Sequence, residues 1–370
     1  KALPAFLQDA GYRTIHAGKA HFGAIGTPGR DPLNVGFDVN IGGHAAGGPG
    51  SYLGSQNFSA VWRKGDRIWD VPGLEKYHGK DVFLTEALTI EANLAIDKAV
   101  VDEKPFFLYM AHYAVHVPFA KDNRFYQKYV DKGLNQTEAM YAAIVEGMDK
   151  SLGDLIKNVD RLGLSDNTIV LFMSDNGGLS ASGRGGKAHT HNKPLSSGKG
   201  SAHEGGVRVP MIAHWPGVTK PRSTCQQAVI IEDFFPTILD LASIDERQQV
   251  GGVIDGQSFV GLLKGERDPS RDTRPLFWHF PNNWGPKGPG IGPSSCIRKG
   301  DWKLIYYYET RRFELYNITD DLGEQKNLSE TNVELCNELA TALLQHLTKV
   351  RAQFPIDKKT GQPLTIPITP

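Results

Sequence analysis

Hydrophobic and polar positions along this chain switch repeatedly between helical and extended patterns. Apolar residues at helical spacing predict helices at 3–9, from an Asp81 cap to about residue 100, from a Thr137 cap to about residue 162, and at 233–241. Apolar runs without alternation predict buried strands at 12–17, 105–111, 168–173 and 207–213. Because strands and helices alternate, roughly the first 265 residues predict an α/β fold with a mostly parallel central sheet flanked by helices.

The pattern changes from about Arg271 onward. Short strand candidates separated by turns lie at 276–280, 295–298, 302–308 and 314–318, and residues 333–354 have helical spacing. This predicts a small C-terminal antiparallel sheet with a closing helix. We therefore predict an α/β domain over residues 1–268 and an α+β subdomain over residues 269–370.

Composition and charge narrow the possible partners. The 370 residues contain 41 Lys and Arg against 41 Asp and Glu, so the formal net charge is zero. This balance gives no electrostatic reason to expect nucleic acid or a membrane surface as a partner. No apolar run is long enough to span a bilayer, and the three cysteines have neither metal-ligand spacing nor a disulfide framework.

The strand predicted at 168–173 ends in Ser174, Asp175, Asn176 and two glycines. In open α/β sheets ligands bind outside the carboxyl ends of the strands, where Asp175 and Asn176 would stand. Both offer the hard oxygen ligands that Ca²⁺ or Mg²⁺ takes. The alternative is an ordinary exit turn, because Asp, Asn and Gly dominate turns.

Similar polar stretches follow or flank other strand ends. They contain Lys19 with His21, then His116, and then Lys199. Singly, such residues are more often structural histidines or surface lysines. Together with a cation they suit a tetrahedral oxyanion, since fixed positive charge stabilises its oxygens and an imidazole can protonate a leaving alkoxide.

These stretches carry a resemblance that extends from the first residues to about residue 330. The blocks are Ala10–Thr14 with Gly18–Gly23, Val115–Pro118, Ser174–Gly178, Gly198–Gly200 with Glu204–Gly206, Asp233–Leu239, Asp255–Ser258 and Arg298–Leu304. In this order they resemble the type I, formylglycine-dependent sulfatases of the alkaline phosphatase superfamily.

The resemblance implies a role for each matching residue. Asp175 and Asn176 would be metal ligands, of Ca²⁺ with Mg²⁺ as the other choice. Lys19 would bridge nucleophile and sulfate, and His21 would hydrogen-bond the nucleophile. His116 and Lys199 would hold the sulfate, with His116 as the proton donor to the leaving oxygen. His203, beside the Lys199 loop, is a further candidate for substrate binding, while Glu204 and Arg208 would shape the turn after Lys199.

One departure from the family pattern concerns the nucleophile. No Cys or Ser in residues 1–370 precedes an X-Pro-Ser-Arg sequence, which carries the formylglycine in the family, and two acidic metal ligands of the family's first strand are also missing. We expect both to lie upstream, in a protein of which this chain is an N-terminally truncated part. The 370-residue chain alone is then expected to lack sulfatase activity and to bind metal weakly.

The function that the resemblance implies is exo-type removal of sulfate from a carbohydrate. A polar rim with Gly and Trp, at 24–52 and 278–291, favours a sugar over a lipid, and an aryl sulfate ester is a second possible substrate. Two alternatives stay open: a phosphomonoester or phosphonate hydrolase of the same superfamily, and a non-catalytic remnant that binds sulfated glycan. The family implies a periplasmic, secreted or lysosome-like location, and the sequence leaves the oligomeric state undecided.

Overall fold

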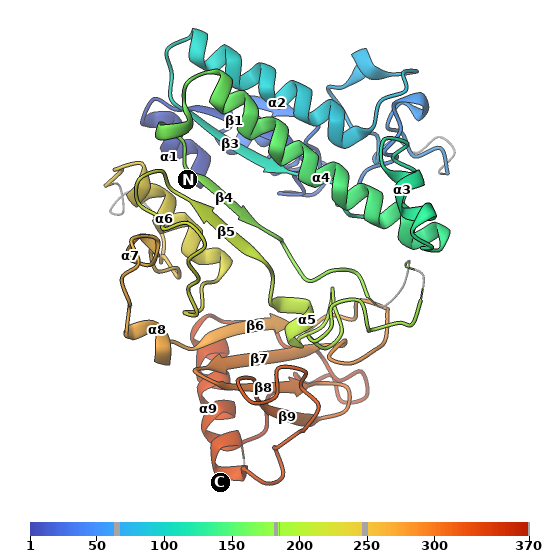
Figure 1. The fold of residues 1–370 in the computed structure, drawn as a ribbon. Helices are drawn as coiled ribbons and strands as arrows, with labels where there is room; N and C mark the ends of the chain where they lie inside the picture. Colours follow the sequence, from blue (N-terminus) through green and yellow to red (C-terminus); the bar gives the residue numbers. More distant parts are fainter. Residues whose placement is uncertain (63–66, 181–183, 185, 246–250, 369–370) are drawn as a thin grey trace. The chain divides into compact units, whose positions relative to one another are not determined.

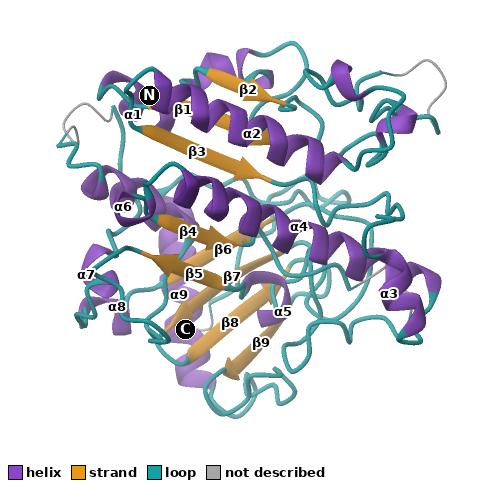
Figure 2. Cartoon of the chain, turned by 45° about the horizontal axis from the view of Figure 1, so that its top comes forward, coloured by secondary structure: helices purple, strands orange, loops and turns teal. Residues whose placement is uncertain are grey.

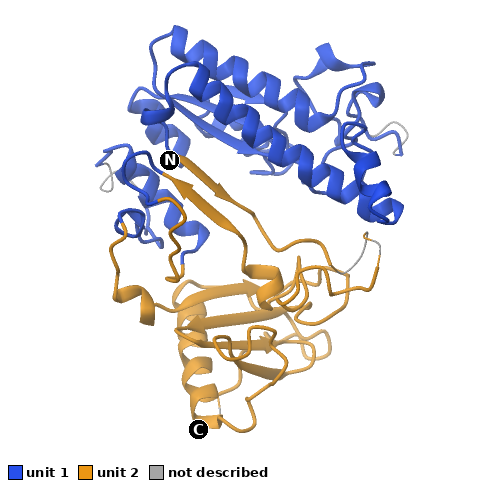
Figure 3. Ribbon diagram, in the orientation of Figure 1, with its two compact units in different colours: residues 1–169, 215–220, 229–264 blue, residues 170–214, 221–228, 265–370 orange. Residues whose placement is uncertain are grey.

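The chain is described by a computed structural model that covers all residues except 63–66, 181–183, 185, 246–250 and 369–370. It contains two compact units, coloured separately in Figure 3. Unit 1 comprises residues 1–169, 215–220 and 229–264, and unit 2 comprises residues 170–214, 221–228 and 265–370. The units thus divide the chain differently from the predicted boundary at 268/269, which stays a prediction.

Unit 1 is an α/β structure around a parallel sheet (Figure 1). Its helices and strands are α1 (Leu3–Asp9), β1 (Arg13–Gly18), β2 (Val39–Ile41), α2 (Leu84–Val101), β3 (Phe106–Ala111), α3 (Tyr126–Asp131), α4 (Gln136–Arg161), α6 (Phe234–Leu241) and α7 (Val260–Leu263). The strand order is β2–β1–β3, and Ile15 pairs with Val39 on one side and Leu108 on the other. The predicted parallel sheet is confirmed for these strands.

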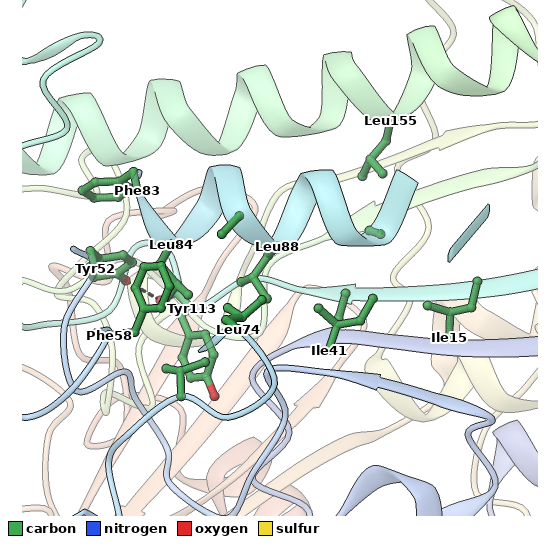
Figure 4. Packing of buried hydrophobic residues seen from close by; sticks show 14 of the residues in the cluster. Ile15, Ile41, Tyr52, Phe58, Leu74, Phe83, Leu84, Leu88, Tyr113 and Leu155 are labelled. Carbon is green, nitrogen blue, oxygen red and sulfur yellow. Dashed lines mark hydrogen bonds between the residues drawn. The ribbon is translucent and has the colours of Figure 1, made fainter. Parts of the chain in front are cut away.

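The core of unit 1 lies between this sheet and α2, as Figure 4 shows. Ile15 and Ala17 of β1 belong to the same buried cluster as Leu84 and Leu88 of α2. Successive strand residues point to opposite faces, so one face of β1 meets the helix. Helix α4 packs against the outer side of α2 and adds Ile144. Each fully buried Leu or Ile contributes roughly 1.5–3 kcal/mol by leaving water.

Unit 2 contains the predicted C-terminal antiparallel sheet (Figure 2). Its elements are β4 (Val170–Met173), α5 (Glu204–Val207), β5 (Met211–His214), α8 (Ser270–Thr273), β6 (Leu276–Phe280), β7 (Ser294–Lys299), β8 (Trp302–Tyr307), β9 (Arg312–Asn317) and α9 (Val333–Lys349). The order β6–β7–β8–β9 is antiparallel throughout. Leu304 and Leu315 of the sheet pack against Leu339 and Leu343 of α9. The prediction of a small sheet closed by one helix is confirmed.

The segments at 168–173 and 207–213 differ from their predictions. Strands β4 and β5 pair antiparallel, and Ile212 of β5 is 64% exposed. Every residue of β4 is half-buried, whereas a strand covered on both faces was predicted. The two-stranded ladder explains the difference, because no third strand pairs with it among the described residues of unit 2. Residues 204–207, partly within the second prediction, form the short helix α5 instead.

The long helices begin at other caps than the predicted ones. Asn135 caps α4, where its side-chain oxygen accepts hydrogen bonds from the backbone N–H groups of Thr137 and Glu138. Phe83, without a side-chain cap, precedes α2 in place of Asp81. Within the described residues, no helix combines the length and the apolar character that crossing a bilayer requires.

Candidate functional site: two residue groups

Lys19 and His21 follow β1 directly, and backbone contacts fix both positions. The N–H of Lys19 donates to the carbonyl of Ala111 at the end of β3, over 2.6 Å. Gly18 makes this approach possible: its φ is +105°, and a Cβ atom there would lie 2.0 Å from the Ala111 carbonyl oxygen. His21, with a φ of +56°, is held by a hydrogen bond from its N–H to the carbonyl of His44. The signature after β1 therefore lies at the carboxyl end of the parallel sheet.

His116 lies in the segment that follows β3. The Tyr52 hydroxyl donates to the carbonyls of Tyr113 (2.7 Å) and His116 (2.9 Å), which holds this turn in place. Nδ1 of His116 lies 2.7 Å from the carbonyl of Val117. Because a carbonyl oxygen only accepts, Nδ1 carries a proton. Donation of a second proton from Nε2 therefore requires the imidazolium form of His116.

The glycine pair Gly47–Gly48 brings His21 and His116 to one place in unit 1. A Cβ atom on Gly47 would lie 2.9 Å from the ring of His21, and one on Gly48 would lie 2.8 Å from Nδ1 of His116. Adjacent Cα atoms are about 3.8 Å apart, so the two imidazoles flank neighbouring residues of one loop. This loop belongs to the stretch predicted as a site rim.

His16, which was not predicted as a site residue, contacts the backbone of Lys19 through its side chain. Its ring is buried, with Phe22, Phe37 and Tyr109 at centroid distances of 5.2–5.7 Å, and its Nε2 donates to the carbonyl of Lys19 over 3.2 Å. Burial lowers the pKa of His16 to about 4. A neutral imidazole thus positions the Lys19 backbone at physiological pH. No periodic signal marks a lone His inside a β-strand, so the sequence could not reveal it.

The lowered pKa of His16 makes the stability of unit 1 depend on pH. The unfolded chain protonates His16 near pH 6.5 and the folded chain only near pH 4, so its contribution is complete above pH 6.5 and is lost as the pH falls toward 4. This group alone is expected to remove about 2 kcal/mol of unfolding free energy between pH 7 and pH 4.5. Urea titrations of wild type and His16→Gln measure it. Equal pH slopes in the two proteins would contradict the assignment.

His112, which lies close to His116 in the chain, is a buried histidine. Its Nδ1 atom is inaccessible and has no hydrogen-bond partner among the described residues, and burial lowers the pKa of His112 to about 4. By its position four residues before His116, His112 could either flank the site or pack in the interior. This environment favours packing.

The second group of predicted residues lies in unit 2, where the turn after β4 meets the Lys199 loop. The N–H of Gly177 donates to the carbonyl of Gly206, and the N–H of Lys199 donates to the carbonyl of Gly178. The side-chain amide of Asn192 donates to Gly178 as well. The structure therefore brings the segment of Asp175 and Asn176, the Lys199 loop and α5 together within unit 2.

Asp175 and Asn176 fit a hard cation by donor type. Asp175 is exposed, and the Asn176 amide nitrogen donates to the carbonyl of Gly177 over 3.3 Å. A carboxylate and an amide oxygen are hard ligands, but Ca²⁺ takes six to eight oxygens. Among the described residues no cluster of three or more His, Cys, Asp and Glu side chains forms a cation site. Asp175 and Asn176 thus supply part of a coordination sphere.

His203 is buried and has partners on both ring nitrogens. Nε2 donates to Glu314 over 3.1 Å, and Nδ1 accepts from the Ser196 hydroxyl over 2.9 Å. Although burial raises the pKa of the Glu314 carboxyl, hydrogen bonds from His203 and two tyrosines hold it below its usual value. This geometry favours a positioning role, in which His203 ties the loop before Lys199 to β9. Its predicted contact with substrate stays a prediction.

Glu204 and Lys303 form the centre of a buried ionic cluster in unit 2. Nζ of Lys303 lies 2.9 Å from Glu204 and 3.0 Å from Glu324, and all three side chains are almost fully buried. Burial raises the pKa of both carboxyls, but the Lys303 charge holds that of Glu204 below its usual value, while that of Glu324 stays raised. Arg208 contacts Glu204 at 3.7 Å. The framework role expected for Glu204 and Arg208 agrees with this arrangement, whereas Lys303 and Glu324 were not foreseen as their partners.

Comparison with known proteins shows which protein family the chain resembles. Residues 1–244 match the family described as Sulfatase, and residues 198–353 match the one described as N-sulphoglucosamine sulphohydrolase, C-terminal. A protein of Formosa agariphila named Sulfatase is 30% identical over 98% of this chain and 72% of its own length. The N-acetylgalactosamine-6-sulfatase of Mus musculus is 32% identical over 88% of this chain and 58% of its own length.

Comparison with solved structures also finds proteins with a similar fold. Ps i-CgsB in complex with k-i-k-neocarrahexaose matches with a TM-score of 0.77 and 28% identity, over 93% of this chain and 73% of that one. BT4656 in complex with D-Glucosamine-2-N, 6-O-disulfate, at 19% identity and a TM-score of 0.66, shares the fold. This chain spans less than two thirds of the mouse relative and 72% of the Formosa one. The chain belongs to the sulfatase family.

Proposed function

We propose that the protein hydrolyses sulfate esters of carbohydrates, releasing sulfate from the end of a glycan. The observation that carries the proposal is the pair His21 and His116, flanking Gly47 and Gly48 beyond the ends of two neighbouring parallel strands. The names of the relatives support a carbohydrate, since one is named N-acetylgalactosamine-6-sulfatase and one similar structure is a complex with k-i-k-neocarrahexaose. We also propose an extracytoplasmic location, which the resemblance to the family implies.

Each residue group has a distinct task in this proposal. Lys19 and Lys199 place positive charge on the sulfate oxygens, whose negative charge shifts as the ester bond breaks. His116, as the imidazolium, donates its Nε2 proton to the departing sugar oxygen. His21 is the second imidazole beside the reacting group. Asp175 and Asn176 would hold Ca²⁺, or Mg²⁺ in its place.

The family generally uses a metal ion and a formylglycine. When bound, the metal supplies Lewis-acid stabilisation of a sulfate oxygen and the formylglycine supplies the nucleophile. No Cys or Ser in residues 1–370 has the X-Pro-Ser-Arg context of that nucleophile. The test of function therefore uses the complete protein that the gene encodes.

The role of His116 predicts a dependence on the leaving group. With a sugar sulfate, whose alkoxide needs a proton, His116→Ala is expected to lower kcat by about 10²–10⁴-fold. With 4-nitrophenyl sulfate, whose phenolate leaves unprotonated, the loss should be far smaller. Sulfate release measured by ion chromatography gives both values, and His214→Ala, on the exposed side of β5, is the matched control.

Three outcomes would redirect the proposal. An equal loss of kcat on both substrates would show that His116 is not the acid. Release of phosphate from a phosphomonoester, without release of sulfate, would favour the phosphohydrolase alternative. Binding of sulfated glycan without any turnover by the complete protein would favour the non-catalytic remnant.

A further inference from the structure

Lys199 lies in a β-turn of unit 2, which is called the Lys199 turn below. The N–H of Ser201 donates to the carbonyl of Gly198 over 3.0 Å, which closes the turn with Lys199 and Gly200 at its centre. Gly200 has a φ of +85°, as the second central residue of a type II turn requires. The N–H of Lys199 donates to the carbonyl of Gly178 over 3.1 Å. The conformation of this turn sets the direction in which the Lys199 side chain leaves the backbone.

A second segment of unit 2, residues 284–291, lies against this turn and is called the Trp284 segment (Figure 3). The N–H of Ala202 donates to the carbonyl of Gly290 over 2.8 Å. The Ser201 hydroxyl donates to the carbonyl of Pro289 over 2.9 Å. These two hydrogen bonds attach the Trp284 segment to the residues at the end of the Lys199 turn, although about 90 residues of sequence separate them.

Glycines bring the two segments into direct contact. A Cβ atom on Gly200 would lie 2.2 Å from Cε3 of Trp284, so the half-buried indole packs on the backbone of the Lys199 turn itself. A Cβ atom on Gly288 would lie 2.1 Å from Cε1 of His189, which precedes the turn. Side chains larger than hydrogen are therefore excluded at both glycines. The Trp284 segment thus contacts the Lys199 turn and the residues before and after it.

We propose that Trp284 is a positioning residue for Lys199. The indole covers Gly200 and keeps the Lys199 turn in one conformation, so that the Lys199 side chain leaves the backbone in one direction. The inference rests on the proposed function, in which the Lys199 ammonium acts on the sulfate oxygens. A displacement of about 1 Å at a reacting group can cost about 10²-fold in rate, so a contact that fixes the turn is expected to affect catalysis.

Hydrogen exchange of the 370-residue chain, followed by mass spectrometry, tests the contact without turnover. In Trp284→Ala the amides of residues 198–202 should exchange about tenfold faster than in wild type, because the Lys199 turn opens more often. The amides of β8 should keep their rates. Asn282→Ala, at an exposed position two residues before Trp284, is the matched control and should exchange like wild type. Equal exchange at 198–202 in wild type and Trp284→Ala overturns the proposal.

A double-mutant cycle in the complete protein tests whether Trp284 acts through Lys199. Hydrolysis of 4-nitrophenyl sulfate reports on the sulfate group, since the phenolate leaves without a proton. Trp284→Ala should lower kcat/KM by about 10–10²-fold in the wild-type background, but by less than about twofold in the Lys199→Met background. Trp284→Phe, which keeps a ring against Gly200, should retain most of the activity. Losses that simply multiply in the double variant overturn the proposal, because a purely structural role gives that result.

The two measurements separate this inference from the proposed function. A complete wild-type protein that releases no sulfate contradicts the hydrolase function, whereas the exchange rates at 198–202 still decide whether Trp284 fixes the Lys199 turn. Fast exchange in β8 as well would show that Trp284→Ala unfolds. Trp284→Leu, which keeps an apolar side chain, then carries both measurements with the same expected directions, and wild-type exchange and activity in that variant overturn the proposal.

Discussion

Replacing Lys303 with methionine is expected to lower the free energy of unfolding by about 3–5 kcal/mol. The ammonium is the shared partner of Glu204 and Glu324, and none of the three side chains is more than slightly exposed. Methionine fills a similar volume but carries no charge, so two carboxylates remain buried without their cation. The large effect arises from burying these carboxylates without Lys303, with Arg208 left at 3.7 Å from Glu204, rather than from the lost attraction itself.

Denaturant unfolding of Lys303→Met, followed by fluorescence, measures the loss. Lys299→Met is the matched control. Lys299 also pairs with a glutamate, Glu338, at 2.9 Å, but the side chains of this pair are 41% and 59% exposed. Exposed pairs contribute at most about 1 kcal/mol, so this variant should stay close to wild type. The triple variant Lys303→Met, Glu204→Gln, Glu324→Gln should recover part of the loss. A Lys303→Met protein as stable as Lys299→Met would refute the account.

Gly177→Ala is expected to be nearly as damaging, at about 3 kcal/mol or more. A Cβ atom at Gly177 would lie 1.7 Å from the carbonyl oxygen of Gly205, which no rotamer change can relieve. The turn that carries Asp175 and Asn176 would have to separate from α5. The hydrogen bond from Gly177 to Gly206 would be lost as well.

The matched control is Gly153→Ala in the middle of α4, where a new Cβ atom meets nothing within 4 Å. Alanine is the better helix former by about 1 kcal/mol, so this variant should be neutral or more stable than wild type. Thermal unfolding of both proteins gives the comparison. If Gly177→Ala unfolds at the wild-type temperature, the close contact with Gly205 is not a constraint on the fold.

Elements with strong periodicity could be predicted from the sequence almost to the residue. The strand at 276–280 and the helix at 3–9 have the predicted bounds. Capping was less certain because competing cap residues lie close together: Asn135 and Thr137 are both good caps, and Asn135 accepts the two hydrogen bonds. The burial predicted for 168–173 failed because an apolar run does not reveal how many strands will flank it.

The site residues stay predictions, and the sequence pattern draws attention only to those that lie in motifs. All of these predicted residues follow strands or lie in tight turns, which the sequence pattern can indicate. They are Lys19, His21, His116, Asp175, Asn176 and Lys199. Supporting residues have no such signal. His16 stands inside a strand, and Lys303 reaches Glu204 across 99 residues of sequence. Long-range electrostatic partners leave no local periodicity, and only the folded chain shows them.

The buried ionic cluster of Glu204, Lys303 and Glu324 affects the order in which parts of the protein can fold during synthesis. The N–H of Glu204 donates to a carboxylate 120 residues further along the chain, at Glu324. A ribosome adding about 5–20 residues per second needs roughly ten seconds to supply that partner. Until then the loop of Lys199 lacks the cation and the carboxylate that hold α5, and it must close over a long span. The parallel strands of unit 1 can pair much earlier, so the two residue groups mature at different times during synthesis.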